Sequence, residues 1–274
     1  MRKVQTIIAL FLFFIHAGSN AQDGAMKAVS IYWGAGNIIR QDLVFSPFKH
    51  KDRTLLQGGI VFERQKKFFH EINIGFSQYD PMLRDPYIFY EYEDKQTAQP
   101  HQFTIISLDY SMAKPVIEHG KAKILLGGSL KNKVQALNYT YGRISNFGYF
   151  ASTGLGLYAA YLQQIGEKFR LSASVQLPLL SWLARSPYLV NDDEFIENTA
   201  SHKGLNTFLA FIEDGQLASL NRFQSFDLTT RYYYKISSQL ELGLQNQITF
   251  LHASRPRNLY SLQTEISLSG RFTF

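Results

Sequence analysis

Polar and apolar side chains alternate through the end of this chain, from Glu265 to the terminal Phe274. Successive side chains of a β-strand point to opposite faces, so the pattern predicts a strand with one polar and one apolar face. The same alternation recurs along most of the chain, and no stretch beyond the N-terminus reaches the ~18 consecutive apolar residues of a membrane helix. The sequence therefore predicts an all-β fold.

A period-two template predicts ten strands of about 11 to 17 residues, where strands of soluble proteins usually have about 5 or 6. Because no linker or shift in composition divides residues 22–274, we expect a single domain. The predicted strands lie near residues 27–39, 54–64, 67–79, 102–113, 121–132, 147–163, 168–183, 222–236, 239–254 and 258–274.

The first 21 residues have the features of a secretory signal. Arg2 and Lys3 precede an apolar run, Ile7 to Ile15, that is too short to span a bilayer, and small residues follow at 19–21. We predict that residues 1–21 are a removed signal peptide. The chain contains no Cys, which excludes disulfides and thiolate chemistry.

The predicted connectors alternate in length. Those at 65–66, 114–120, 164–167 and 237–238 are short, whereas those at 40–53, 80–101, 133–146 and 184–221 are mostly longer, with a short exception at 255–257. An even number of strands places both termini at the end that carries the short turns. Short turns on one side and long loops on the other are typical of outer-membrane barrels.

The chain resembles the family of small outer-membrane β-barrels over nearly its whole mature length. The resemblance implies a single transmembrane antiparallel up-and-down barrel of about ten strands in the outer membrane of a Gram-negative bacterium, with periplasmic termini. It also implies that the exported chain is surrounded by outer-membrane lipid and that Phe272 and Phe274 are read by the barrel-assembly machinery. The alternative is a secreted β-sandwich or lipocalin-like barrel. The long strands argue against it, as do the aromatic residues expected at strand ends: Trp33, Phe68, Tyr149, Phe169, Tyr234, Phe272 and Phe274.

Alternation divides the strand residues between two faces. The face expected to contact lipid carries Leu56, Ile60, Phe62, Ile72, Ile74, Phe76, Ile106, Leu108, Tyr110, Leu155, Leu157, Leu171, Val175, Leu177, Leu228, Tyr232, Leu242, Leu244, Ile248, Ile266 and Leu268. The face expected to line the lumen carries six acids and six bases: Glu63, Glu71, Asp109, Asp227, Glu241, Glu265, Lys123, Lys131, Arg170, Arg231, Lys235 and Arg271.

Equal numbers of opposite charges predict a lumen filled by crosswise ion pairs, since unpaired charges in a narrow interior are costly. A ten-stranded barrel is too narrow for a general porin, although a narrow diffusion channel stays an alternative. Small residues facing inward are expected to make room for large rings rather than to form a conduit. The small residues are Gly34, Gly36, Gly59, Gly75, Gly127, Gly154 and Gly156, and the large rings are those of Tyr32, Tyr79, Tyr158 and Tyr233.

One constellation suggests catalysis. His252 and Ser254 end the ninth predicted strand, and their spacing resembles the lipid A deacylase barrels, in which a lipid-facing His activates a Ser against an acyl ester and an acid orients the His. Glu265 is the nearest acid at a suitable spacing. We favour a structural role for His252 at the rim of the barrel. The alternative is a lipid A or phospholipid acyl-ester hydrolase.

No other enzyme class finds support. The chain lacks P-loop, dinucleotide-binding, hydrolase-elbow and zincin motifs, so we expect no cofactor. Ten strands also invite comparison with the omptin proteases, but the only comparable acids, Asp192-Asp193-Glu194 with His202 nearby, lie in the longest loop. We interpret them as solvated rather than catalytic or metal-binding. A net charge of +6 without a basic stripe gives no reason to expect nucleic acid as a partner.

The outer loops are the expected place for function, because loops on a rigid scaffold commonly bind. One carries an aromatic and acidic segment, and another carries an apolar segment at near-helical spacing over residues 205–220, which either caps the barrel or contacts an outer-membrane protein partner. We therefore predict a structural or binding component rather than an enzyme. Its candidate binding residues are Tyr87, Phe89, Tyr90, Tyr92, Phe208 and Phe211.

Overall fold

The fold was analysed in a computed structural model. It describes residues 26–81, 87–91, 93–98, 101–141, 144–186, 190–191, 213 and 215–274. The predicted signal peptide lies outside these residues, as do the acidic segment 192–194, His202 and the loop candidates Tyr92, Phe208 and Phe211.

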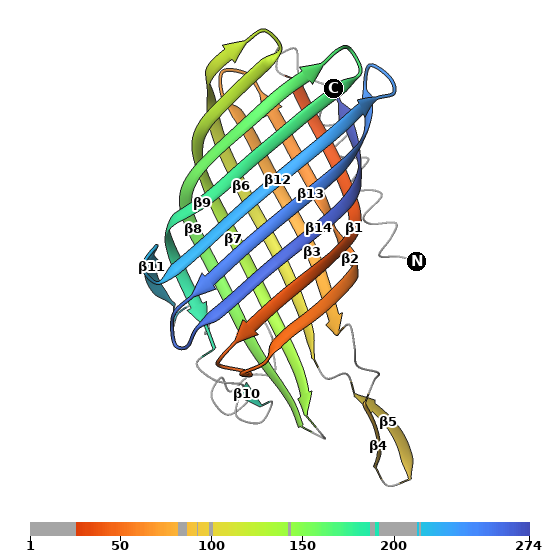
Figure 1. Cartoon of the computed structure of the whole chain (residues 1–274), viewed down its shortest axis with the longest axis vertical. Coiled ribbons are helices and arrows are strands. Elements are labelled where there is room, and N and C mark those ends of the chain that lie inside the picture. Colours follow the sequence, from red (N-terminus) through yellow and green to blue (C-terminus); the bar gives the residue numbers. More distant parts are fainter. Residues whose placement is uncertain are drawn as a thin grey trace.

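Ten long antiparallel strands form a closed barrel, because the first strand pairs with the last as well as with the second. Figure 1 shows these strands wrapping around one axis with a common tilt. The prediction of a ten-stranded antiparallel barrel is confirmed. In order around the wall, the strands are β1 (Met26–Asp42), β2 (Lys49–Gln65), β3 (Phe69–Pro81), β6 (Gln102–His119), β7 (Ala122–Tyr141), β8 (Ile144–Ile165), β9 (Phe169–Arg185), β12 (Phe223–Lys235), β13 (Leu240–Ala253) and β14 (Leu259–Thr273).

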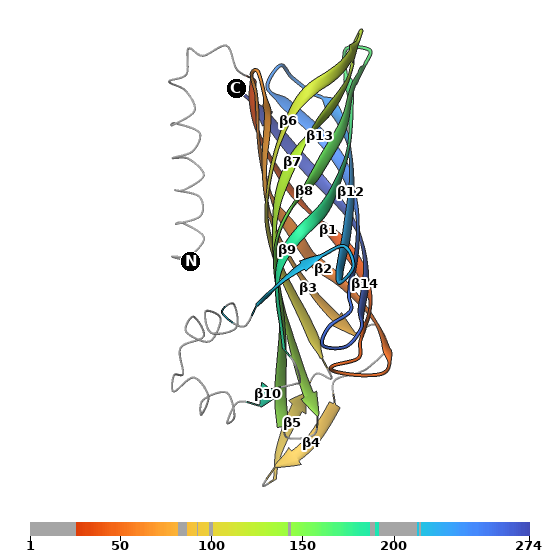
Figure 2. The ribbon, with the colours of Figure 1, turned by 90° about the vertical axis from the view of Figure 1, so that its left-hand side faces the viewer.

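Four short strands lie outside this wall. β4 (Tyr87–Glu91) and β5 (Asp94–Ala98) form a separate hairpin, β10 (Val190–Asn191) pairs with β8, and β11 (Gln216–Ser219) pairs with β9. All four lie toward the end of the barrel opposite the C-terminus (Figures 1 and 2). Within the described residues, no helix is long and apolar enough to cross a membrane.

The two ends of the barrel differ in their connectors. Short turns at 66–68, 120–121, 166–168 and 236–239 share one end with the C-terminus, and Gly120 and Gly166 adopt there the positive φ angles that glycine tolerates. The other end, called the mouth below, carries the connectors 43–48, 82–101, 142–143, 186–222 and 254–258.

Two of the expected connectors are mostly strand. Residues 114–119 continue β6, and the expected loop 133–146 contains the end of β7 and the start of β8, leaving only 142–143 between them. The hydrophobic alternation weakens beyond the apolar band, where Ala136 and Asn138 lie on the outer face. The sequence pattern therefore predicted hairpins that were too short.

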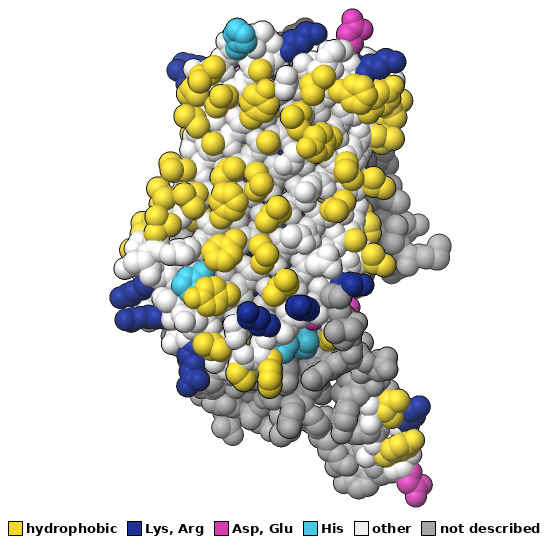
Figure 3. All heavy atoms as spheres, in the orientation of Figure 1, with side chains coloured by type: hydrophobic (Ala, Val, Ile, Leu, Met, Phe, Trp, Pro, Cys, Tyr) yellow, Lys and Arg dark blue, Asp and Glu magenta, His cyan; other side chains and the backbone are white. Residues whose placement is uncertain are grey.

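The outer face is apolar around the middle of the barrel. Figure 3 shows hydrophobic side chains over much of this wall, with Lys and Arg gathered toward both ends of it. None of the residues expected to face lipid is buried, and Leu268 on β14 is 73% exposed. Trp33, expected near a strand end, lies instead near the middle of β1, where it is 57% exposed.

The wall is irregular where β9 meets its neighbours. Pro178, which has no N–H to donate, lies at a β-bulge in the register between β8 and β9, and both Leu179 and Leu180 are exposed there. Pairing between β9 and β12 ends at Gln176 and Asp227. Beyond this point, β11 takes the place of β12 along the edge of β9. The two strands therefore separate toward the mouth.

Candidate functional site

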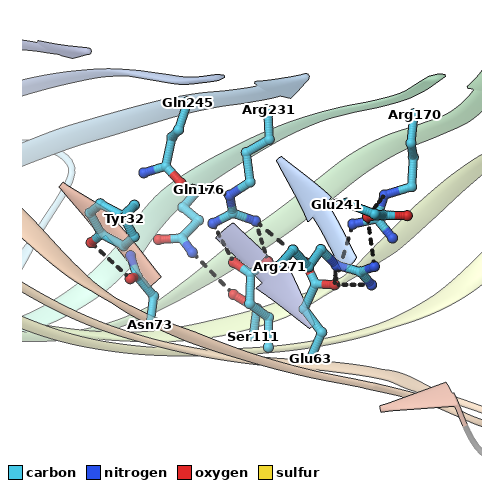
Figure 4. A network of polar contacts seen from close by, with 11 residues as sticks. Tyr32, Glu63, Asn73, Ser111, Arg170, Gln176, Arg231, Glu241, Gln245 and Arg271 are labelled. Atoms are coloured by element: carbon cyan, nitrogen blue, oxygen red, sulfur yellow. Dashed lines mark hydrogen bonds and ion pairs between the residues drawn. The ribbon is translucent and has the colours of Figure 1, made fainter. Parts of the chain in front are cut away.

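The lumen near the short-turn end contains an ion-pair cluster centred on Glu63. Its carboxylate accepts hydrogen bonds from Nε and Nη2 of Arg271 at 3.0 and 2.8 Å, and from Nη2 of Arg170 at 3.5 Å. Arg271 also donates to Glu241 at 2.9 Å. Figure 4 shows these side chains, which come from β2, β9, β13 and β14, converging in the interior. The contact between Glu63 and Arg170 crosses the lumen, whereas Arg271 reaches Glu63 over the intervening β1 and Glu241 on the adjacent β13.

Arg231 extends this cluster toward the middle of the barrel. Its Nη1 lies 2.6 Å from Glu71 Oε2 and 3.9 Å from Glu63 Oε1, and its Nε donates to Gln245 at 3.0 Å. The Arg231 side chain is only 3% exposed. An arginine removed from water in this way is tolerated because carboxylates surround it.

A second polar group lies further toward the mouth. Asp227 forms an ion pair with Lys131, lies 4.0 Å from the Lys133 Nζ and accepts a hydrogen bond from Thr249 at 2.5 Å. Asp109 lies opposite Lys131 in the register between β6 and β7. All four charged residues of this group are buried.

Tyrosines fill the space that inward-facing glycines leave. A Cβ added to Gly59 would lie 2.5 Å from the Tyr32 hydroxyl, and one added to Gly36 would lie 2.9 Å from the Tyr79 hydroxyl. Tyr79 donates to Glu265 at 2.6 Å. A cavity of about 30 Å³ beside Tyr32 and Glu265 is large enough for very few water molecules. The lumen is filled here by interlocking side chains.

Two of the twelve charges expected in the lumen lie at its margin. Lys123 forms a 3.4 Å pair with Glu118 beside the β6–β7 turn, and both side chains are more than a third exposed. Lys235 is exposed at the end of β12, and the described residues give it no acidic partner. Expecting these two inside was wrong, because both lie at the short-turn rim of the barrel, where their side chains reach solvent.

The alternation pattern missed an arginine pair at the mouth. Arg40 and Arg185 both contact the carboxylate of Asp42, Arg40 at 3.0 Å through Nη2. Arg40 also donates to Gln135 and lies 5.2 Å from the centre of the Phe103 ring. Their position was missed because 40–53 and 184–221 were expected to be connectors. The signal available in the sequence for this ion-pair cluster was the presence of one Asp and two Arg, namely Asp42, Arg40 and Arg185, beside the ends of predicted strands.

A second buried pair at the mouth was also missed. His101 Nε2 lies 2.9 Å from Asp52 Oδ1, and both residues are buried. The imidazole of His50 lies edge-on to His101, with 4.7 Å between ring centres. The described residues contain no group of three His, Cys, Asp or Glu side chains that could hold a metal ion.

The three catalytic candidates do not form a triad. The His252 ring stacks on Tyr260 at 4.3 Å on the outer face, and Ser254 Oγ donates to the carbonyl oxygen of Arg222 at 3.3 Å. Glu265 points into the lumen, where it binds Tyr79. No acid within the described chain orients His252, so this geometry does not support acyl-ester hydrolysis.

The remaining predicted residues occupy both ends. Phe272 and Phe274 are exposed on the outer face, and the backbone of Phe274 exchanges hydrogen bonds with Lys27 at 2.9 and 3.2 Å. Tyr87 and Phe89 belong to the strand β4. Tyr90, on the same strand, is 66% exposed at the mouth. Binding by these loop candidates therefore stays a prediction.

The fold is similar to that of solved outer-membrane barrels. The outer membrane protease OmpT from Escherichia coli superimposes with a TM-score of 0.57 at 6% identity, covering 92% of this chain and 98% of that one. Neisserial surface protein A and the Yersinia pestis protein Ail cover 92% and 90% of this chain, and 100% and 99% of their own, at 10% and 8% identity. Their TM-scores of 0.38 and 0.29 are too low to support an argument.

Sequence comparison adds no closer relationship, since neither a protein-family model nor a curated protein sequence matches this chain. At 6% identity, the likeness to OmpT concerns the fold and not the activity. The protein is thus a closed ten-stranded antiparallel barrel with the fold of an outer-membrane β-barrel protein.

Proposed function

We propose that this protein is an integral outer-membrane barrel with a sealed lumen, and that it acts as a structural or binding component through its mouth. The observation that carries this proposal is the filled lumen. Ion pairs cross it from Glu63 to Arg170 and from Glu71 to Arg231, and tyrosines occupy its middle.

The outer wall supports the placement in a membrane. A closed barrel pairs the backbone groups of its strands with one another, as a lipid environment demands. The apolar band between Lys- and Arg-rich ends has the character of a surface that contacts hydrocarbon (Figure 3). By the same proposal, the end with the short turns and the C-terminus lies in the periplasm, and the mouth faces outward.

The polar contacts argue against a diffusion channel. Arg231 and Arg271 are each anchored to carboxylates on other strands, so opening a path requires several ion pairs to separate together. A conduit would instead need a continuous hydrated core. We therefore expect the barrel to insert without conducting ions.

Planar-bilayer recording of the purified mature protein tests the sealed lumen. We expect electrically silent insertion, with insertion verified separately by heat modifiability on gels. The double variant Tyr32→Ala/Tyr79→Ala removes the rings at the middle of the lumen without removing a charge, and should show more frequent current steps. Stable, salt-dependent steps from the unmodified protein would contradict the proposal.

Tryptophan quenching tests the membrane placement independently. The chain has two Trp, of which Trp33 projects outward near the middle of β1 and Trp182 lies toward the mouth on β9. In vesicles of brominated phosphatidylcholine, the Trp182→Phe variant should be strongly quenched by bromine near the bilayer centre. The matched Trp33→Phe variant should be quenched less at that depth. Unquenched Trp33 would rule out this orientation of the wall in the bilayer.

A further inference from the structure

The mouth contains a pocket of about 670 Å³, which is within the size range of small-molecule sites. This mouth pocket lies where β9, β11 and the β13–β14 connector meet. It is lined by Tyr149, Leu183, Arg185, Gln216, Leu217, Ala218, Arg222, Arg255 and Pro256.

The irregular wall explains why a pocket occurs here. β9 and β12 stop pairing at Gln176 and Asp227, whereas β12 continues to pair with β13 as far as Phe223. β11 then pairs with β9 over residues 180–183. The lumen below is filled, but the separated strands leave a hollow between β9 and the turn that carries Arg222.

The described lining of the pocket carries positive charge. Among the described residues that line it are three arginines and no acid. Arg185 shares the carboxylate of Asp42 with Arg40. Arg222 and Arg255 have no acidic partner in the described part of the chain. Two positive charges that have no acidic partner among the described residues therefore border the same space.

The backbone around these arginines is held in place. Arg185 Nη1 donates to the carbonyl oxygens of Arg255, at 2.9 Å, and of Arg257, which ties the β13–β14 connector to β9. The Arg222 carbonyl oxygen accepts from the Ser254 N–H at 2.9 Å and from its hydroxyl at 3.3 Å. A backbone that is fixed before a ligand arrives loses less entropy on binding.

The rest of the lining is largely apolar. Leu183 and Pro256 line the pocket, and Leu217 is 59% exposed although it lies beside them. An exposed apolar side chain next to unpaired guanidinium groups suits a ligand that carries both an anion and an apolar part. Guanidinium groups bind phosphate oxygens through paired hydrogen bonds, and two free positive charges match a phosphate dianion.

We propose that the mouth pocket binds a phosphate monoester joined to an apolar group, with Arg222 and Arg255 contacting the phosphate and Leu217 the apolar part. This inference rests on the proposed function, because it names the ligand class of the binding end. The phosphate could belong to a lipid or to a soluble ester, and the two sources require different probes.

Calorimetric titration of the full mature protein in a neutral maltoside detergent tests this inference. The probes are dihexanoyl phosphatidate for the lipid, phenyl phosphate for the soluble ester, and inorganic phosphate. We expect one of the two esters to bind at least tenfold more tightly than inorganic phosphate, and the tighter ester identifies the source. Equal affinity for all three, or no binding, would overturn the proposal.

Variants locate the binding. Arg222→Ala/Arg255→Ala should weaken the tighter ester at least tenfold, and Leu217→Ser should weaken it while leaving inorganic phosphate unchanged. Arg257→Ala is the matched control, because Arg257 lies on the same connector but does not line the pocket. An equal loss in Arg257→Ala would show a general charge effect and refute the site. If no ester binds at this pocket, the silent bilayer recordings and the quenching of Trp33 are unaffected. Failure of this inference is therefore distinguishable from failure of the proposed function.

Discussion

Arginines in the lumen and arginines at the mouth have opposite surroundings. Arg231 and Arg271 are buried, and each lies within 4 Å of two carboxylates. Arg222 and Arg255 border a pocket whose described lining contains no acid. The first pair stabilises one closed arrangement of the wall, whereas the second pair is available to a ligand. The same type of side chain therefore contributes to stability in one region of the barrel and to recognition in the other.

The largest effect is expected in the lumen. Arg231→Ala should lower the free energy of unfolding by about 3–5 kcal/mol, because it leaves the buried Glu71 without its charged partner. Urea unfolding in lipid vesicles measures this loss. The double variant Arg231→Met/Glu71→Met should recover most of the stability, since no unpaired charge remains. A double variant as unstable as the single one would show that the ion pair is not the cause.

Packing in the middle of the lumen should be the next most sensitive feature. In Gly59→Ala the new Cβ would lie 2.5 Å from the Tyr32 hydroxyl and 2.2 Å from the Ile74 carbonyl oxygen. Overpacking of this kind typically costs about 1–3 kcal/mol. Gly270→Ala is the control, because nothing lies within 4 Å of its added Cβ. Equal unfolding midpoints for the two variants would argue against a tightly filled lumen.

At the mouth, the expected effect is local rather than global. Arg185→Met removes the hydrogen bonds to the carbonyl oxygens of Arg255 and Arg257, so the β13–β14 connector should open more often. Trypsin should then cleave after Arg257 several times faster, while the urea midpoint changes less than in Arg231→Ala. Unchanged cleavage would mean that other contacts hold this connector. The Lys49→Ala variant controls for loss of a surface charge.

The smallest effect is expected at the short-turn end. Lys123 and Glu118 form an exposed pair, and such pairs usually contribute about 0–1 kcal/mol. Lys123→Ala should therefore barely move the unfolding midpoint, and added salt should change it equally in the variant and the parent. A loss comparable to that of Arg231→Ala would place Lys123 inside the network after all.

Much of the fold followed from the sequence. The count and order of the ten strands and the outer position of residues such as Leu268 were predicted, because period-two alternation reports directly which face of a strand each residue occupies. The ends were predicted less well. Beyond the apolar band the outer face becomes polar, so the pattern fades while β7 and β8 continue.

The candidate sites depended more on contacts that the sequence pattern cannot specify. Alternation placed Glu71 and Arg231 on the inner face, but it could not show that they would meet across the lumen, because that depends on which strands face each other in the closed barrel and on their register. The spacing of His252 and Ser254 suggested a hydrolase, although alternation placed Glu265, the nearest acid, on the lumen face. The structure separates this acid from the other two residues by directing it to the opposite face of the sheet.

The sequence by itself determined a closed, two-faced barrel, since alternation, strand length and the parity of the strands are local properties that add up along the chain. Only the tertiary structure decided which charges pair and where the wall opens. Arg185 meets Asp42 because strands far apart in sequence curve toward each other, and the mouth pocket exists because β9 and β12 separate at Gln176. Both features depend on how strands far apart in the sequence meet around the closed wall, which no local pattern records.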